Sequence, residues 1–242
     1  VSRWQSGRTD LTPEKAAKEH RVAQAALHRG QEQQRAAQAR ISRRLESPPV
    51  MTALAPQAAT LDDVLKAQGL AGDEDPAALC RAMASRHYEN FPVLSFAVPK
   101  SRRAAVAAVY AFCRAVDDLG DEGPHPKEER LALLDAWEED LLKVWSGGPR
   151  HPVHRALAPV VKQFGIPDQP FRRLIRANRM DQVRKRYATF EELREYCRHS
   201  AEPVGRLVLY VLGQFDEDKA RLSDATCTAL QLANFWQDVA RD

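Results

Sequence analysis

Apolar residues recur every three or four positions through most of the chain from about residue 75 onward. Two such sets stand out: Val106, Val109, Tyr110, Cys113 and Val116, and then Leu131, Leu134, Trp137, Leu141 and Trp145. This spacing is typical of helices that turn one face toward a core. Further helices are expected over residues 169–185, 189–212 and 223–242, with Thr189 and Ser223 as N-caps. No run alternates as a strand does, so we predict an all-α domain.

Residues 1–50 differ in composition from the rest of the chain. They hold ten Lys and Arg against five Asp and Glu, which leaves 26 basic and 28 acidic residues in the other 192. This segment therefore carries a charge of +5 and the rest of the chain −2, so a general nucleic-acid surface on the body is not expected. Residues 13–44 have almost no large apolar side chains, so we expect a leader that is disordered or a detached helix.

We therefore divide the chain into this Gln/Arg/Ala-rich leader, 1–50, and a domain, 51–242. Residues 1–50 have two interpretations. Translation naturally starts at Met51 and the preceding residues come from an over-extended gene start, or these residues are a genuine basic arm. No segment has the roughly 20 apolar residues of a membrane span, and the N-terminus lacks a secretory signal. We expect a cytoplasmic protein that touches a membrane at most peripherally.

The cysteines and histidines show no metal-binding spacing. The four cysteines form no CxxC pair, which predicts reduced thiols. His151 and His154 are expected in a loop without an acidic partner, and a structural role is predicted for them.

Two pairs of carboxylates stand four residues apart, Asp117 with Asp121 and Asp238 with Asp242. On a helix, this spacing puts both members on one face, where they can share a cation. Oxygen ligands of this kind suit Mg²⁺, which also takes phosphate oxygens of a substrate. A solvated helix face is the alternative for either pair alone. Long apolar runs precede both pairs, however, and favour an apolar cavity with a metal-binding mouth, suited to an apolar substrate with an anionic head.

Several motifs together resemble the squalene and phytoene synthases, a family of all-α class I isoprenoid synthases. They are the run 110–122 around Asp117, Met180-Asp181 with Arg186-Tyr187, the run 196–205, and the run 231–242. Residues 89–93 resemble the hydroxysqualene synthase branch of bacterial hopanoid pathways. Since family members continue for several more helices, the resemblance implies a helical bundle that is incomplete at the C-terminus.

The resemblance also implies roles for individual residues. Mg²⁺ would be held by Asp117, Asp121, Asp238 and Asp242. The expected catalytic residues are Tyr110, Arg114 and Tyr196. The expected substrate-binding residues are Arg114, Arg186, Tyr187, Gln231 and Asn234. The basic side chains between residues 172 and 186 form either a solvated face or a patch that faces phosphate or membrane.

The implied reaction is the Mg²⁺-dependent conversion of presqualene diphosphate to hydroxysqualene. Squalene or phytoene synthesis from two prenyl diphosphates, such as farnesyl diphosphate, is the nearest alternative. A non-catalytic helical scaffold of the same family is a further one. Expected partners are the prenyl diphosphate substrate and other enzymes of the pathway, with no nucleic acid.

Overall fold

The computed structural model describes residues 58–86 and 98–238. The chain divides into two units, Val1–Ala55 and Pro56–Asp242. The first unit lies outside the described residues, as do the motif at 89–93 and Asp242, so predictions about them remain predictions.

The second unit is built from helices, and the described residues contain no strand. In chain order the helices are α2 Leu61–Ala67, α3 Pro76–Arg86, the 3₁₀ turn η2 Lys100–Arg102, α5 Arg103–Asp121, α6 Lys127–Ser146, α7 Pro152–Phe164, α8 Gln169–Val183, α9 Phe190–Ser200, α10 Glu202–Leu212 and α11 Glu217–Asp238. The predicted all-α class is confirmed.

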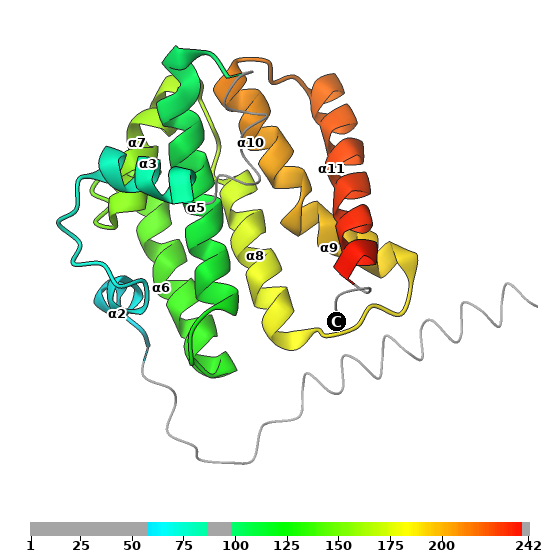
Figure 1. Ribbon diagram of the computed structural model, residues 1–242, viewed down its shortest axis with the longest axis horizontal. Helices are drawn as coiled ribbons and strands as arrows, with labels where there is room; N and C mark the ends of the chain where they lie inside the picture. Colours follow the sequence, from blue (N-terminus) through cyan, green and yellow to red (C-terminus); the bar gives the residue numbers. More distant parts are fainter. Residues whose placement is uncertain (1–57, 87–97, 239–242) are drawn as a thin grey trace, which may run out of the picture. The chain divides into compact units, whose positions relative to one another are not determined.

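Helix α5 lies at the centre of this unit and contacts α3, α6, α7, α8 and α10 (Figure 1). Its buried face is rich in alanine, which allows neighbouring helices to approach closely. Phe112 is fully buried there, with its ring centroid 5.6 Å from that of Trp137 on α6 and 5.0 Å from that of Phe171 on α8. These aromatic contacts fix α5 within the core, and so fix the direction in which its last turns point.

The structure corrects two helix boundaries. The helix expected over 189–212 is two helices that meet at Ala201, because Pro203 is tolerated in the first turn of a new helix but not in a helix interior. Helix α11 begins at Glu217 rather than at Ser223, and the Asp216 side chain accepts a 2.8 Å hydrogen bond from the Lys219 amide. Thr189 caps α9 as predicted and accepts a hydrogen bond from the Glu192 amide.

Helix α11 packs against α10 and α9 through one face and lies at the edge of the bundle in Figure 1. Gly205 brings α10 and α11 together, since a β-carbon there would lie 2.3 Å from the Ser223 hydroxyl oxygen. Arg206 on α10 donates two nitrogens to the Asp224 carboxylate of α11, the shorter bond being 2.6 Å. This planar, two-point pairing holds α11 against the bundle.

The expectation that His151 and His154 lack an acidic partner is wrong. His151 is the N-cap of α7, and His154 lies within that helix with its Nδ1 2.9 Å from the Asp140 carboxylate. Asp140 also accepts hydrogen bonds from the amides of Arg150 and His151. Asp140 lies on α6, 11 residues before His151 and 14 before His154, and the packing of α6 against α7 brings it to them. The group ties α6 to the start of α7, which agrees with the predicted structural role.

All four cysteines are free thiols, as expected. Among the described helices, none combines the length and the apolar character needed to cross a bilayer.

Candidate functional site

The first acidic pair lies at the end of α5 and opens onto a cavity. Helix α5 continues through Asp121, so Asp117 and Asp121 occupy the same face, as predicted. Both line a cavity of about 210 Å³ that is bounded by three further helices: Leu174, Ala177, Asn178 and Asp181 come from α8, Tyr196 and Ser200 from α9, and Gln231 from α11. The structure therefore brings together Asp117, Asp121, Tyr196 and Gln231, four of the predicted site residues.

Asn178 holds the Asp117 carboxylate in place. Its Nδ2 donates hydrogen bonds to Asp117 Oδ1 at 3.1 Å and to the Leu174 carbonyl at 3.2 Å. The amide is buried against Gly120, where a β-carbon would lie 2.0 Å from Asn178 Oδ1. Gly120 thus permits a close approach of α8 to α5, and Asn178 uses that approach to orient Asp117.

Two carboxyl groups of the cavity have raised pKa values. Partial burial raises the pKa of Asp117 to about 6; the hydrogen bond from Asn178 opposes the rise and the charge of Asp121 adds to it. Burial likewise raises the pKa of Asp181 to about 6, against the hydrogen bond from Tyr196 and with the charge of Asp121. Asp121 therefore repels both of its neighbours, and a bound cation would relieve this repulsion.

Tyr196 connects the two sides of the cavity. Its hydroxyl donates a 2.8 Å hydrogen bond to Asp181 Oδ2, and its ring lies 5.4 Å from that of Tyr187 and 6.1 Å from that of Phe235. Burial raises the pKa of the Tyr196 hydroxyl, and the charge of Asp181 raises it further. Tyr196 thus stays protonated and presents both an oxygen and an aromatic face near the carboxylates.

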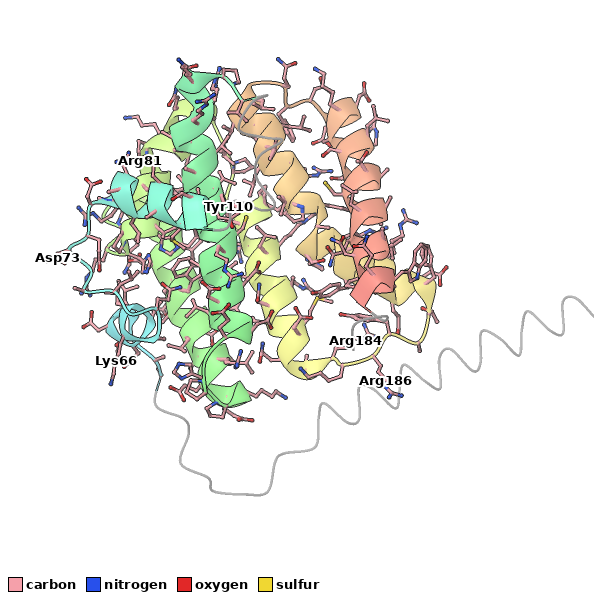
Figure 2. The ribbon with its side chains drawn as sticks, in the orientation of Figure 1. Lys66, Asp73, Arg81, Tyr110, Arg184 and Arg186 are labelled. Carbon is pink, nitrogen blue, oxygen red and sulfur yellow. The ribbon has the colours of Figure 1, made fainter. Side chains whose placement is uncertain are left out.

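A second cavity of about 560 Å³ shares Asp181 and Tyr196 with the first. Its other lining residues include Tyr187, Phe235, Trp236 and the basic side chains of Arg184, Lys185 and Arg186. The Arg184 guanidinium lies 4.8 Å from the centroid of the Tyr187 ring. Arg186 extends away from the helices on the segment after α8 (Figure 2). Basic and aromatic groups therefore adjoin the acidic cavity on one side.

A family model for squalene/phytoene synthase matches residues 84–242. The chain belongs to the squalene/phytoene synthase family. The phytoene synthase of Arthrospira platensis is 38% identical over 68% of this chain, and the hydroxysqualene synthase of Sinorhizobium fredii is 37% identical over 67% of it. The matches cover 57% and 54% of those proteins, so the chain spans little more than half the length of these curated relatives.

Solved structures agree with this assignment. Squalene synthase HpnC from Alicyclobacillus acidocaldarius superposes with a TM-score of 0.65 at 48% identity, over 73% of this chain and 64% of that one. A dehydrosqualene synthase in complex with ligand superposes with a TM-score of 0.59 at 30% identity, over 71% of this chain and 58% of that one. The predicted isoprenoid synthase fold is confirmed.

Other site residues predicted from the family resemblance lie outside the acidic cavity. Arg114 forms ion pairs with Asp118 and Glu122 and lines a separate cavity of about 380 Å³. Tyr110 lies further back on α5, near the crossing with α3 in the view of Figure 2, and lines none of these cavities. Their catalytic roles remain predictions.

The remaining predicted residues lie on either side of the cavity. Arg186 and Tyr187 line the second cavity, and Asn234 is exposed on α11. Asp238 is the last residue of α11, and its role remains a prediction. Among the more N-terminal arginines of the basic run, Arg172 and Arg179 pair with Glu138 on α6, and the two alternatives for this run remain predictions.

Three polar residues of the cavity were not predicted as functional, namely Asn178, Asp181 and Ser200. Asp181 lies in a motif that carried the family resemblance, and that motif was a usable signal. Ser200 likewise lies in the run 196–205. Asn178 gave no signal, because a single polar residue on a helix is common on solvated faces. Glu202 does not line this cavity and accepts a hydrogen bond from Thr228.

Proposed function

We propose that the protein is a hydroxysqualene synthase that converts presqualene diphosphate to hydroxysqualene in a Mg²⁺-dependent reaction. Two relatives support this choice: squalene synthase HpnC, which is 48% identical over 73% of this chain, and the hydroxysqualene synthase of Sinorhizobium fredii, which is 37% identical over 67% of it. The reaction would ionise the diphosphate, rearrange the cyclopropylcarbinyl cation and capture it with water.

The donor set of the cavity fits Mg²⁺. Asp117, Asp121 and Asp181 supply carboxylate oxygens and Gln231 supplies an amide oxygen, all hard ligands. Within residues 58–86 and 98–238, no three acidic, histidine or cysteine side chains lie close enough to hold a metal ion on their own. Mg²⁺ commonly uses one or two carboxylates and completes its shell with water and phosphate oxygens. We therefore assign Asp117 and Asp121, with Asp238 and Asp242, to ions that also bind the substrate diphosphate.

Bound Mg²⁺ would neutralise the negative charge that develops on the departing diphosphate. The protein's own contribution is to position and to shield. Asn178 holds Asp117 in one orientation, so the ligand charge does not have to reorganise during the reaction. The aromatic rings of Tyr187, Tyr196 and Phe235 adjoin the cavity, and their faces can stabilise a carbocation.

A second candidate is the condensation of two prenyl diphosphates, as in a phytoene or squalene synthase. It is favoured by the curated relatives, among which phytoene synthases of Arthrospira platensis, Synechococcus elongatus and Synechocystis share 32–38% identity with this chain. In that reaction the same carboxylates would bind the same diphosphate group, so cavity geometry alone does not separate the two.

Product analysis separates them. Protein expressed from its complete reading frame is incubated with presqualene diphosphate and Mg²⁺, without NADPH, and the C30 products are identified by mass spectrometry. Formation of hydroxysqualene would support the proposal, and absence of this product would contradict it. Condensation of added prenyl diphosphates without turnover of presqualene diphosphate would support the second candidate.

The non-catalytic scaffold is tested by binding. A thermal shift with Mg²⁺ and a diphosphate analogue is expected for an enzyme, because a ligand that binds only the folded state stabilises it. No shift together with no turnover would support the scaffold.

A further inference from the structure

Ser200 presents an unpaired hydroxyl to the acidic cavity. It is the last residue of α9, its Oγ is buried, and no hydrogen-bond partner for that atom occurs in the part of the chain that the structure describes. A serine near the end of a helix commonly bonds a carbonyl of the preceding turn, and this one does not. Buried polar groups are nearly always satisfied, by protein or by ordered water. We therefore expect the Ser200 hydroxyl to form a hydrogen bond with a molecule in the cavity that it lines.

The cavity can hold water beside Ser200. A water molecule occupies about 30 Å³ in the liquid, and the cavity measures about 210 Å³. A stable buried water needs two to four polar partners. Tyr196 lies one helical turn before Ser200 on the same face of α9, and its oxygen keeps a free acceptor position while its hydrogen bonds to Asp181. Gln231 adds an amide from α11.

The other lining residues are apolar, are already hydrogen-bonded or belong to the proposed metal site. Asn178 donates to Asp117, and Asp181 accepts from Tyr196. Leu174 and Ala177 supply the apolar part of the lining, and both are buried residues of α8. The carboxylates of Asp117 and Asp121 lie on α5, where the proposed metal and diphosphate would occupy them. Ser200 therefore offers a neutral polar group that neither the metal nor the diphosphate requires.

We infer that Ser200 binds the water that captures the carbocation, an inference that rests on the proposed function. Ser200 Oγ accepts a hydrogen bond from one O–H of this water, which leaves a lone pair of the water oxygen for the cationic carbon. That lone pair forms the new C–O bond, and the second O–H proton passes to the released diphosphate. The carbon gains a hydroxyl, no electron is supplied from outside, and Ser200 is unchanged.

The alternative role for Ser200 is structural, as a small residue where α9 meets α10 at Ala201. The two roles differ in what they control. A water-binding serine controls the ratio of two products: the alcohol formed when water captures the cation, and the hydrocarbon formed when the cation loses a proton. A structural serine affects the stability of the protein and the overall rate, and does not change the product ratio.

The test compares Ser200→Ala with the wild type in protein expressed from its complete reading frame. Ser200→Thr keeps the hydroxyl, and Ser223→Ala is a matched control on α11, where the Ser223 hydroxyl contacts the Cys227 sulfur. Each protein receives presqualene diphosphate and Mg²⁺ without NADPH. Diphosphate release, the ratio of alcohol to hydrocarbon products and the melting temperature are measured.

For Ser200→Ala we expect diphosphate release within about threefold of the wild type, and a fall of about tenfold in the ratio of alcohol to hydrocarbon, the size that the loss of one hydrogen bond allows. Ser200→Thr should restore most of the ratio, and Ser223→Ala should leave it unchanged.

An unchanged ratio in Ser200→Ala, with or without a lower melting temperature, would overturn the role of Ser200 and leave the proposed function standing. No diphosphate release by the wild type would overturn the proposed function, and the inference with it.

Discussion

Gly120 on α5 lies directly against the side chain of Asn178 on α8: a β-carbon at position 120 would come within 2.0 Å of Asn178 Oδ1. The same Asn178 donates a hydrogen bond to Asp117. We therefore predict that Gly120→Ala displaces Asn178 from Asp117 and lowers the free energy of unfolding by about 1–3 kcal/mol, as overpacking of a buried contact does. Urea denaturation measures this loss.

A double-mutant cycle shows whether the contact is the cause. Asn178→Ala removes the group that the new methyl would meet, so Gly120→Ala should cost less in that background than in the wild type. Equal costs in both backgrounds would mean that the strain of Gly120→Ala arises elsewhere.

Asp117 is predicted to be a ligand of the metal–diphosphate complex. Asp117→Asn removes a ligand charge, so diphosphate release should fall by about a hundredfold, comparable to the loss of one preorganised charge contact at a reacting centre. The thermal shift produced by Mg²⁺ and a diphosphate analogue should shrink in parallel. Asp238→Asn is expected to behave in the same way.

The matched control is Asp218→Asn at the start of α11. Asp218 is exposed and pairs only with the nearby Arg221 among the described residues, so little change is expected in either measurement. A full thermal shift in Asp117→Asn would remove Asp117 from the metal site.

The sequence predicted those parts of the site that depend on local spacing. Asp117 and Asp121 share a face because helix α5 continues through both, and a four-residue spacing is enough to foresee this. Arg114 belongs to the neighbouring row that continues through Asp118 and Glu122, and its ion pairs follow the same rule. The resemblance grouped both rows in one site, whereas the structure places them on different cavities.

The parts that the sequence did not predict depend on packing between helices. Asn178 reaches Asp117 from 61 residues away, and Asp140 reaches His154 across the α6–α7 turn. No periodic pattern encodes such pairs, because each residue alone looks like a polar residue on a helix surface. The break between α9 and α10 was visible in Pro203, whose place in a first turn marks the start of a helix.

Tyr196 lowers the pKa of Asp181 through its hydrogen bond, while burial raises that pKa to about 6. Tyr196→Phe removes the donor and leaves the burial, so we predict that the pKa of Asp181 rises above about 6. Carboxyl carbon chemical shifts followed through a pH titration measure it. Tyr187→Phe is the control, because the Tyr187 hydroxyl has no partner among the described residues. A lower pKa in Tyr196→Phe would contradict the assigned hydrogen bond.

His151 and His154 make stability sensitive to acid. Both are fully buried, and burial lowers the pKa of His154 and lowers that of His151 to about 3. His151 Nδ1 accepts a hydrogen bond from the Val153 amide, so its Nε2 carries the hydrogen that faces the Gln68 side-chain oxygen. This neutral form has no room for a second proton without losing the Val153 bond.

The direction of the pH effect follows from these lowered pKa values. Above about pH 6.5 both the folded and the unfolded chain hold neutral histidines. As the pH falls below that value, the unfolded chain binds protons that the folded chain does not, so stability is lost between about pH 6.5 and 3. Each histidine contributes about 1.4 kcal/mol per pH unit, so the histidine part of the loss from pH 7 to 5 is about 2–4 kcal/mol. Asp117 and Asp181, whose pKa values are raised to about 6, gain protons in the folded state over the same range and offset part of that loss. Urea denaturation at the two pH values measures it.

His151→Asn should reduce the loss by about 2 kcal/mol, whereas His125→Asn, at a partly exposed histidine beside Glu129, should not reduce it. An identical loss in His151→Asn and the wild type would show that other groups control the acid response.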